Sequence, residues 1–250
     1  MTLFRKPRYV ARLAQGPEDL RRAQALRYRA FRAGRTAPPG EGLDADAFDA
    51  LCDHVLIEET RSGRLVGCFR IMPLASGREI ARSYSAQHYN LSALEAFPGP
   101  MAEIGRFCVD PDIRDPDILR TAWAAVTAHV DANGTEMLFG CSSFMGTEAE
   151  HYRDAFALLA AAHLAPRRWL PRVKAPRVFR FARRLRLIKP DLKLAMKRMP
   201  PLLRAYLGMG VWVSDHAVID RELDTLHVFT GLEIRAVPQA RARRLRALSG

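Results

Sequence analysis

The feature that most limits the fold is the order in which strand-like and helix-like stretches follow one another. Short apolar runs typical of strands alternate with longer stretches whose apolar residues recur every three to four positions. The order reads β-α-(α)-β-β-β-α-β-α, with a hairpin turn at Ser62-Gly63. Helices that alternate with strands, with hairpins in the middle, predict an α/β (α+β) fold around a mixed sheet.

The predicted elements have the following bounds. We expect strands at residues 9–14, 54–59, 65–74, 102–109, 137–144, 211–220 and 223–234. We expect helices at residues 16–31, 85–96, 118–134 and 150–164, a short helical piece at 44–53, and a loop at 33–44. Residues 1–166 are predicted to form the core domain, 167–210 a basic amphipathic helical segment, 211–236 strands that complete the sheet, and 237–250 a tail.

Composition narrows the class of protein. The 250 residues are 48% hydrophobic, enough for one substantial core, and apolar runs are broken by charge too early for a transmembrane helix. The N-terminus lacks the apolar centre of a secretory signal. The four cysteines have no metal-type spacing and lie in apolar stretches, which predicts buried thiols in a reducing cytoplasm and no metal site.

The positive charge is concentrated in one segment. The formal net charge is +12, and residues 167–204 alone hold 14 Lys and Arg against one acid, Asp191. A segment of this kind is expected to meet an anionic partner, such as nucleic acid, a membrane surface or an acidic protein.

One predicted strand carries charges that do not suit a buried position. Glu103 and Arg106 interrupt the apolar run at 102–109, and burying either charge alone would cost several kcal/mol. In a regular strand, positions 103 and 106 point to opposite faces, and a one-residue bulge between them would bring both to one face. Because bulges are frequent beside active sites, we expect both side chains to line a cleft.

Several motifs resemble one enzyme family, the ornithine–acyl carrier protein N-acyltransferases, a hemolysin-like branch of the GNAT acyltransferase superfamily. The motifs are LRYRAF (26–31), FDALCDH (48–54), GCFRIMP (67–73), EIGRFCV (103–109), FGCSSF (139–144), PPLLRAYLGMG (200–210) and VSDHAVIDRELDTLHVFTGLEI (213–234). The resemblance implies a GNAT-like acyl-CoA N-acyltransferase fold with a splayed strand pair. It also implies a reaction that moves a 3-hydroxyacyl group from acyl carrier protein to the α-amine of L-ornithine, giving lyso-ornithine lipid.

Roles for particular residues follow from the resemblance and from their chemistry. Glu103 is the first candidate for the proton acceptor, directly or through a water, and the backbone around Cys108 and Val109 is expected to bind the acyl-pantetheine arm and the oxyanion. Tyr152 is the candidate acid for the leaving thiolate, with Ser142 and Ser143 as alternatives.

A second group of residues is expected to hold the acceptor. Asp49, Asp53 and His54 form one group, whose carboxylates suit the side-chain ammonium of ornithine. Arg70 or Arg106 suits the carboxylate of ornithine. Arg27 and Phe31 lie four residues apart on one helix face, and the resemblance gives them a role in covering the substrate.

The loop after the charged strand bears on the acyl donor. VDPDIRDPDI (109–118) has no glycine and four aspartates, whereas coenzyme A users commonly have a glycine-rich loop that cradles the pyrophosphate there. The single phosphate of phosphopantetheine could be met by Arg114. We therefore expect the donor to be 3-hydroxyacyl-phosphopantetheine on acyl carrier protein, with no bound cofactor.

The basic segment suits both an acidic carrier protein and an anionic membrane, so we expect a cytoplasmic enzyme that is peripheral on the inner membrane surface. Two alternatives remain open. An acyl-homoserine-lactone synthase using acyl carrier protein and S-adenosylmethionine shares the first five motifs but lacks the basic segment. A nucleic-acid-binding module would use residues 167–204, but these have few aromatics suited to stacking, and nucleic acid is not the expected partner.

Overall fold

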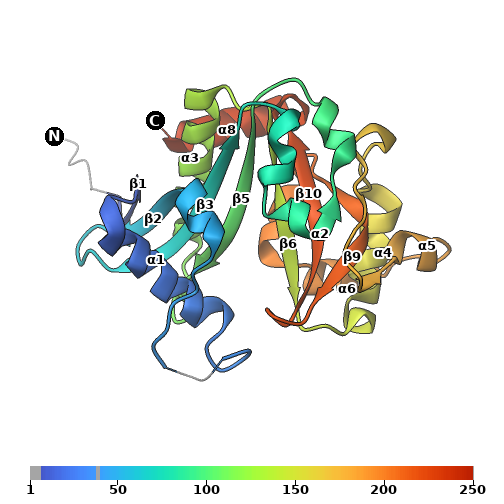
Figure 1. Ribbon diagram of the computed structural model, residues 1–250, viewed down its shortest axis with the longest axis horizontal. Helices are drawn as coiled ribbons and strands as arrows, with labels where there is room; N and C mark the ends of the chain where they lie inside the picture. The colour runs from blue at the N-terminus through green and yellow to red at the C-terminus, as the bar shows by residue number, and fades with distance from the viewer. Residues whose placement is uncertain (1–6, 38–39, 250) are drawn as a thin grey trace. The chain divides into compact units, whose positions relative to one another are not determined.

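The computed structural model describes residues 7–37 and 40–249 and divides them into two compact units. Unit 1 takes its residues from Met1–Met72, Ile104–Gly134 and Ala242–Gly250, and unit 2 from Pro73–Glu103 and Thr135–Arg241. Figure 1 traces the elements from the blue N-terminal to the red C-terminal end. Pro38 and Pro39 of the predicted loop at 33–44 lie outside the described residues.

Unit 1 is built on the strand order β1-β2-β3-β5, with helices on both faces. Its elements are β1 (Tyr9–Leu13), α1 (Gly16–Phe31), the 3₁₀ helix η1 (Ala47–Leu51), β2 (Asp53–Glu59), β3 (Leu65–Leu74), β5 (Met101–Val109), α3 (Pro116–Asn133) and α8 (Gln239–Ser249). The ends of β3, β5 and α8 extend into unit 2. Strand β1 pairs antiparallel with β2. Strand β2 also pairs antiparallel with β3, as the hairpin predicted at Ser62-Gly63 requires.

Two neighbouring residues of β3 show how the helices of unit 1 are arranged. The Cys68 side chain packs with Ala23 and Leu26 of α1. A side chain at Gly67 would lie 3.3 Å from Ile118 of α3. Since successive strand residues point to opposite faces, α1 and α3 cover opposite faces of the sheet.

The backbone of β5 is irregular where a bulge was predicted. Arg106 adopts φ +50°, in the left-handed region that L-residues other than Asn and Asp seldom occupy. The parallel pairing of β5 with β6 (Met137–Met145) covers Met101–Glu103 opposite Met137–Phe139. The regular two-residue alternation of β5 is therefore interrupted after Glu103.

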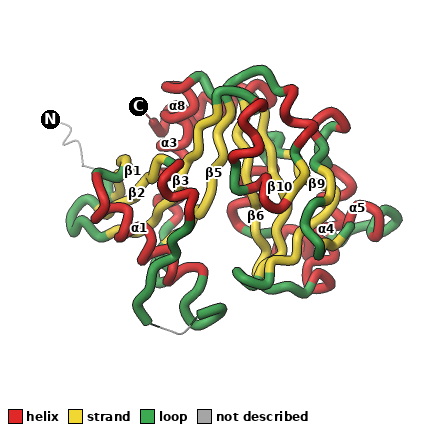
Figure 2. The backbone as a smooth tube through the Cα atoms, in the orientation of Figure 1, coloured by secondary structure: helices red, strands yellow, loops and turns green. Residues whose placement is uncertain are grey.

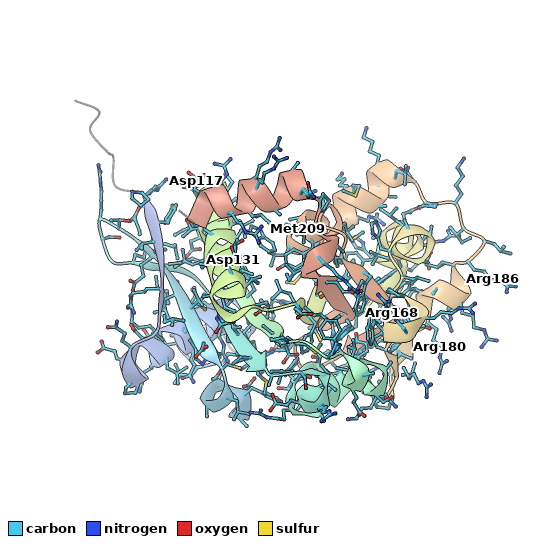
Figure 3. All side chains as sticks on the ribbon, turned by 90° about the horizontal axis from the view of Figure 1, so that it is seen from above. Asp117, Asp131, Arg168, Arg180, Arg186 and Met209 are labelled. Carbon is cyan, nitrogen blue, oxygen red and sulfur yellow. The ribbon has the colours of Figure 1, made fainter. Side chains whose placement is uncertain are left out.

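The C-terminal residues differ from the predicted tail at 237–250, because Gln239–Ser249 form helix α8. Arg246 donates from Nε and Nη2 to the two carboxylate oxygens of Asp131, each over 2.9 Å. Figure 3 shows α8 beside α3, which carries the labelled Asp131. The segment predicted as a tail therefore forms a helix with an ion pair to α3.

Unit 2 is built on the strand order β6-β10-β9-β8, and β6 also pairs with the first residues of β5. Figure 2 shows β6, β10 and β9 side by side, with α4 and α5 next to β9. Its strands besides β6 are β4 (Tyr89–Asn90), β7 (Arg172–Val173), β8 (Val178–Phe179), β9 (Trp212–Asp220) and β10 (Thr225–Glu233). Every residue of β10 is buried, as expected of a central strand.

The helices of unit 2 are short. They are η2 (Gly77–Arg82), α2 (Ser85–His88), η3 (Ser92–Ala96), η4 (Ala149–Tyr152), α4 (Arg153–Ala162), η5 (Arg167–Trp169), α5 (Phe181–Arg184), α6 (Leu192–Arg198), α7 (Pro201–Leu207) and η6 (Ile234–Ala236). Residues 167–210, predicted to form a helical segment, contain η5, α5, α6 and α7. In addition, β8 joins the sheet as an edge strand against β9.

The predicted helix at 85–96 is wrong, because these residues form α2, β4 and η3. The helix is interrupted at Tyr89, whose side chain is buried and whose hydroxyl donates to the backbone oxygen of His227 over 2.7 Å. Tertiary packing of one large aromatic residue therefore overrides the helical pattern.

Tyr89 also lies within a group of histidines that we call the imidazole cluster: the buried His216 and His227 and the half-buried His88. Ring centroids of His227 and His88 are 4.9 Å apart, and those of Tyr89 and His216 are 5.2 Å apart. Burial, with a smaller effect of the neighbouring His88 and His216, lowers the pKa of His227 to about 3. His227 is therefore neutral in the folded protein at physiological pH.

Among residues 7–37 and 40–249, no helix combines the length and the apolar character needed to cross a bilayer.

Candidate active site

Unit 1 contains a dense group of opposite charges, which we call the charged cluster. Three aspartates from one short segment meet arginines from α1, the turn after it, β3 and β5: Asp44, Asp46, Asp49, Arg27, Arg32, Arg70 and Arg106. The four guanidinium groups outnumber the three carboxylates, so the cluster carries a formal excess of one positive charge.

Asp44 is the most deeply buried carboxylate of the cluster, with 1% of its surface exposed. It accepts hydrogen bonds from Arg27 at 3.0 Å, Arg32 at 2.7 Å and Arg106 at 3.0 Å. Burial acts to raise the pKa of Asp44, but the three guanidinium groups outweigh it and hold the pKa below its ordinary value. Asp44 is thus a fixed negative charge around which three arginines are arranged.

Asp49 is held in a similar way. Its carboxylate accepts from Arg27 at 2.7 Å, Arg70 at 2.8 Å and the Gln24 amide at 2.9 Å. Burial opposes ionisation, yet these bonds lower the pKa of Asp49 to about 2. The His54 ring is buried, and its Nε2 lies 2.9 Å from the backbone oxygen of Asp49. The ring therefore contacts the backbone of the segment that supplies the aspartates.

Asp46 has a structural task as well as two arginine partners. It caps the N-terminus of η1, where its side chain accepts from the Phe48 amide at 3.0 Å. The same carboxylate accepts from Arg70 at 2.5 and 3.0 Å and from Arg106 at 3.2 Å. Its side chain is 23% exposed, compared with 1% for Asp44 and 6% for Asp49. Asp46 is therefore the carboxylate of the cluster that solvent reaches.

Arg106 reaches the cluster from its left-handed position in β5. Its side chain is 11% exposed and bridges Asp44 and Asp46. Non-glycine residues in strained backbone regions cost about 1–3 kcal/mol each and persist where the surroundings over-determine them. The ion pairs with Asp44 and Asp46 hold Arg106 in this unfavourable backbone conformation.

Glu103, in unit 2, is also buried, at 5% exposure. Its carboxylate accepts from the Tyr84 amide at 2.8 Å, the Ser85 amide at 2.7 Å and the Ser85 hydroxyl at 2.5 Å. These donors lie at the start of α2, so the short helix fixes the carboxylate in one orientation.

The other residues of the predicted strand motif are placed as follows. Cys108 is buried, with its sulfur 3.6 Å from that of Cys68, and Val109 ends β5. The contact with Cys68 and burial raise the pKa of the Cys108 thiol well above its ordinary value, so this cysteine is not a thiolate nucleophile. Phe31 packs against the core that contains Cys68 and Cys108.

Two predicted binding residues are exposed and lie outside the charged cluster. Asp53 is the first residue of β2, and its side chain is exposed whereas that of His54 is buried. Arg114 is exposed in the loop before α3. Asp49 and Asp53 were expected to act together on the acceptor's ammonium, but Asp49 lies in the 3₁₀ helix η1 and is buried, whereas Asp53 begins β2 and is exposed.

The candidate proton donors for the leaving group lie in unit 2. The Tyr152 hydroxyl donates to the backbone oxygen of Met145 over 2.7 Å. Ser142 is buried, with its hydroxyl 3.5 Å from that of Thr230, and Ser143 is exposed on β6.

Four residues of these two groups were not predicted from the sequence: Asp44, Asp46 and Arg32 of the charged cluster, and Ser85 beside Glu103. The signal for the aspartates was present, because DADAFD holds three of them within six residues and Asp46 is followed three residues later by Asp49, as in a capping box. No sequence pattern points to Ser85, because its contact with Glu103 spans 18 residues.

Comparison with known proteins first defines the class. A family model described as an acetyltransferase (GNAT) domain matches residues 26–124, which include the end of α1, the charged cluster and β5. The chain is thus an acyltransferase with a GNAT-like α/β fold around a mixed sheet, as expected from its motifs.

Relatives define the family more closely. An L-ornithine N(alpha)-acyltransferase from Rhodobacter capsulatus is 34% identical over 243 residues, covering 92% of this chain and 92% of the relative. One from Brucella abortus is 29% identical over 238 residues, covering 90% of this chain and 84% of the relative. The chain belongs to the L-ornithine N(alpha)-acyltransferase family, which confirms the resemblance seen in the sequence.

Solved structures with other activities are also similar. FeeM, an N-acyl amino acid synthase from uncultured soil microbes, aligns over 92% of this chain and 94% of its own, with 9% identity and a TM-score of 0.48. The GphF GNAT-like decarboxylase in complex with isobutyryl-CoA aligns over 90% of this chain and 99% of its own, with 18% identity and a TM-score of 0.49.

Proposed function

We propose that this chain transfers a 3-hydroxyacyl group from acyl carrier protein to the α-amine of L-ornithine. The observation that carries the proposal is the 34% identity to an L-ornithine N(alpha)-acyltransferase over 92% of both chains. Similarity of that extent covers the charged cluster, Glu103 and the basic segment together.

The reaction forms one bond and breaks one. The amine nitrogen attacks the thioester carbonyl, a C–N bond forms, and the C–S bond breaks to release the pantetheine thiol. The α-ammonium must first lose a proton, and the nitrogen loses a second one as the amide forms. The leaving thiolate gains one proton, so one is released to solvent overall. A base, an oxyanion site and a proton source are therefore the groups that the enzyme has to provide.

Glu103 is our candidate for the base, directly or through a water. Its carboxylate is held by three donors at the start of α2, which supports a fixed orientation of the kind that proton transfer requires. Ser85 is then a positioning residue, because it supplies two of those three donors. Backbone amides near Cys108 and Val109 are our candidates for binding the oxyanion.

The charged cluster suits an amino acid acceptor that carries both charges. Its excess of positive charge favours the acceptor carboxylate, for which Arg70 and Arg106 are the candidates. The Asp49 carboxylate already accepts from Gln24, Arg27, Arg70 and the Asp46 amide. Asp46, the carboxylate that solvent reaches, therefore replaces it as our candidate for the side-chain ammonium. Arg27 is fully buried between Asp44 and Asp49 and acts as a positioning residue.

The remaining assignments concern the donor. Arg114 is exposed before α3 and is our candidate for the single phosphate of phosphopantetheine. Tyr152 would have to exchange its bond to Met145 in order to protonate the leaving thiolate, and Ser143 is the exposed alternative. The enzyme is proposed to work in the cytoplasm, next to the membrane that receives its lipid product.

The test is a thiol-release assay with purified protein and 3-hydroxyacyl-carrier protein. Ornithine should release thiol and form the amide, whereas lysine and glutamine measure how strictly the side chain is read. Lactone formed with S-adenosylmethionine would support the synthase alternative. No thiol release with any basic amino acid would overturn the proposal.

Two substitutions connect the assay to the site. Glu103→Gln should reduce turnover by about 10²–10⁴-fold, the usual contribution of a general base. Ser85→Ala should lower turnover about tenfold, shift the pH profile and leave KM for ornithine unchanged, whereas Ser85→Thr restores activity. Equal turnover of Glu103→Gln and the unmodified protein, both folded by circular dichroism, would remove Glu103 from this role.

A further inference from the structure

Residues 180–198, which comprise α5, α6 and the loop that joins them, combine exposed cations with exposed apolar side chains. They hold eight Lys and Arg against one acid, Asp191. In the same stretch Leu187 is 85% exposed, Leu192 61% and Met196 38%. Exposed apolar side chains surrounded by charged ones are typical of an interaction site, so we expect this outer surface to bind a partner.

The inner face of the segment is firmly packed. Phe181 is fully buried, with its ring 5.1 Å from that of Phe156 on α4. The Asp191 amide donates to Asp154 over 2.8 Å, and Arg198 donates to the backbone oxygen of His151 over 2.5 Å. The exposure of Leu187 is thus a property of a docked segment and not of a detached one.

The outer face is well separated from the inner one. On α6, Leu192 and Met196 lie four residues apart on one exposed stripe, whereas Ala195 is buried. Figure 3 shows Arg180 and Arg186 at the outer edge of the ribbon beside α5. Among the described residues, no carboxylate forms an ion pair with Arg183, Arg186 or Lys189.

We propose that the outer surface of residues 180–198 binds the anionic face of a lipid bilayer, with Leu187 inserted among the headgroups. Arginine and lysine attract anionic lipids, and an apolar residue at the tip of a cationic surface enters the interface. The choice of a bilayer over an acidic protein rests in part on the proposed function, whose product is a lipid. The exposed Leu187, Leu192 and Met196 favour it independently.

The test measures sedimentation of the full-length protein with phosphatidylcholine vesicles that contain or lack phosphatidylglycerol. We expect binding to the anionic vesicles alone, weakening steeply as salt is raised. Each cation near an anionic leaflet contributes about fivefold to binding, so Arg183→Gln with Arg186→Gln should weaken it about 25-fold. Leu187→Asp should weaken it about tenfold, because the inserted side chain is lost.

Matched controls come from unit 1. Leu13→Asp changes another exposed leucine, 56% exposed, and Arg21→Gln with Arg61→Gln removes the same charge from other exposed positions. Both controls should bind vesicles as the unmodified protein does. Leu187→Trp should show a blue shift of fluorescence on anionic vesicles, which reports insertion directly.

The outcomes separate this proposal from the proposed function. The Leu187→Asp variant should transfer acyl groups between soluble substrates at the rate of the unmodified protein. If the unmodified protein shows no acyl transfer, that result contradicts the proposed function and not the membrane surface. Equal vesicle binding by all variants, or no blue shift at position 187, overturns the membrane surface. If the Arg183 and Arg186 substitutions abolish carrier-protein binding but not vesicle binding, the carrier protein is the occupant and the proposal is wrong.

Discussion

The charged cluster of unit 1 and the imidazole cluster of unit 2 both contain buried titratable side chains, but they stabilise opposite charge states. In the charged cluster of unit 1, guanidinium groups overcome burial and lower the pKa of Asp49 to about 2. In the imidazole cluster of unit 2, burial is the largest cause that lowers the pKa of His227 to about 3, and His88 and His216 contribute to it. The pKa falls in both, but Asp49 is kept charged and His227 is kept neutral.

The difference teaches that the same direction of shift can have opposite causes. A buried charge persists only where partners of opposite sign surround it, as the three aspartates and four arginines do. A buried base without such partners loses its proton instead. The two clusters should therefore respond differently to loss of a partner and to acid.

The largest effect is expected from removing a partner in the charged cluster. Asp44→Asn leaves Arg27, Arg32 and Arg106 without their shared counter-charge, and breaking a buried ion pair on one side costs about 3–5 kcal/mol. Urea denaturation at pH 7 measures the change in the free energy of unfolding. Asp53→Asn, at an exposed carboxylate of the same region, should change it by less than about 0.5 kcal/mol.

The second effect tests whether His227 is held neutral by burial. Its folded-state pKa is below the unfolded value, so its contribution is complete above about pH 6.5 and is lost as pH falls towards 3. Between pH 7 and pH 4 the unmodified protein should lose about 3 kcal/mol more unfolding free energy than His227→Phe. Equal losses in the two proteins would mean that His227 is protonated when folded.

A smaller effect in a lower pH window is expected from Asp49. Its depressed pKa gives stability that is present above the unfolded value of about 4 and is lost as pH falls towards 2. The gap in unfolding free energy between the unmodified protein and Asp49→Asn should shrink by about 1 kcal/mol from pH 5 to pH 3. A gap that stays constant would contradict the ion-paired state of Asp49.

The smallest effect comes from an exposed pair in the same unit. Arg246→Gln removes the pair with Asp131, whose side chains are 55% and 42% exposed. Exposed ion pairs contribute about 0–1 kcal/mol, so unfolding should change by less than that, and helix α8 should remain by circular dichroism. If Arg246→Gln lowered the free energy of unfolding as much as Asp44→Asn, the cost of losing an ion pair would not depend on its burial.

The sequence predicted the elements whose pattern is local. The apolar stripe of α1 and the strands on either side of Ser62-Gly63 needed only the spacing of their own residues. The irregular backbone at Arg106 was also expected, because an acid and a base three residues apart do not suit a regular buried strand.

The site was predicted in part. Arg27, Asp49, Arg70 and Arg106 do meet in one cluster, although their roles in acyl transfer stay predictions. Asp53 was grouped with Asp49 because the two are close in sequence, but it begins strand β2 and its side chain is exposed outside the cluster. Asp44 was missed because its partners are 17, 12 and 62 residues away in sequence, a separation that no local pattern encodes.

The left-handed backbone of Arg106 means that this position cannot be improved on its own. Glycine would fit φ +50° more comfortably, by about 1 kcal/mol. It would also remove the one guanidinium that Asp44 and Asp46 share, and the loss of both ion pairs outweighs the backbone relief. A search for stabilising glycines at unfavourable dihedral angles should therefore pass over residue 106.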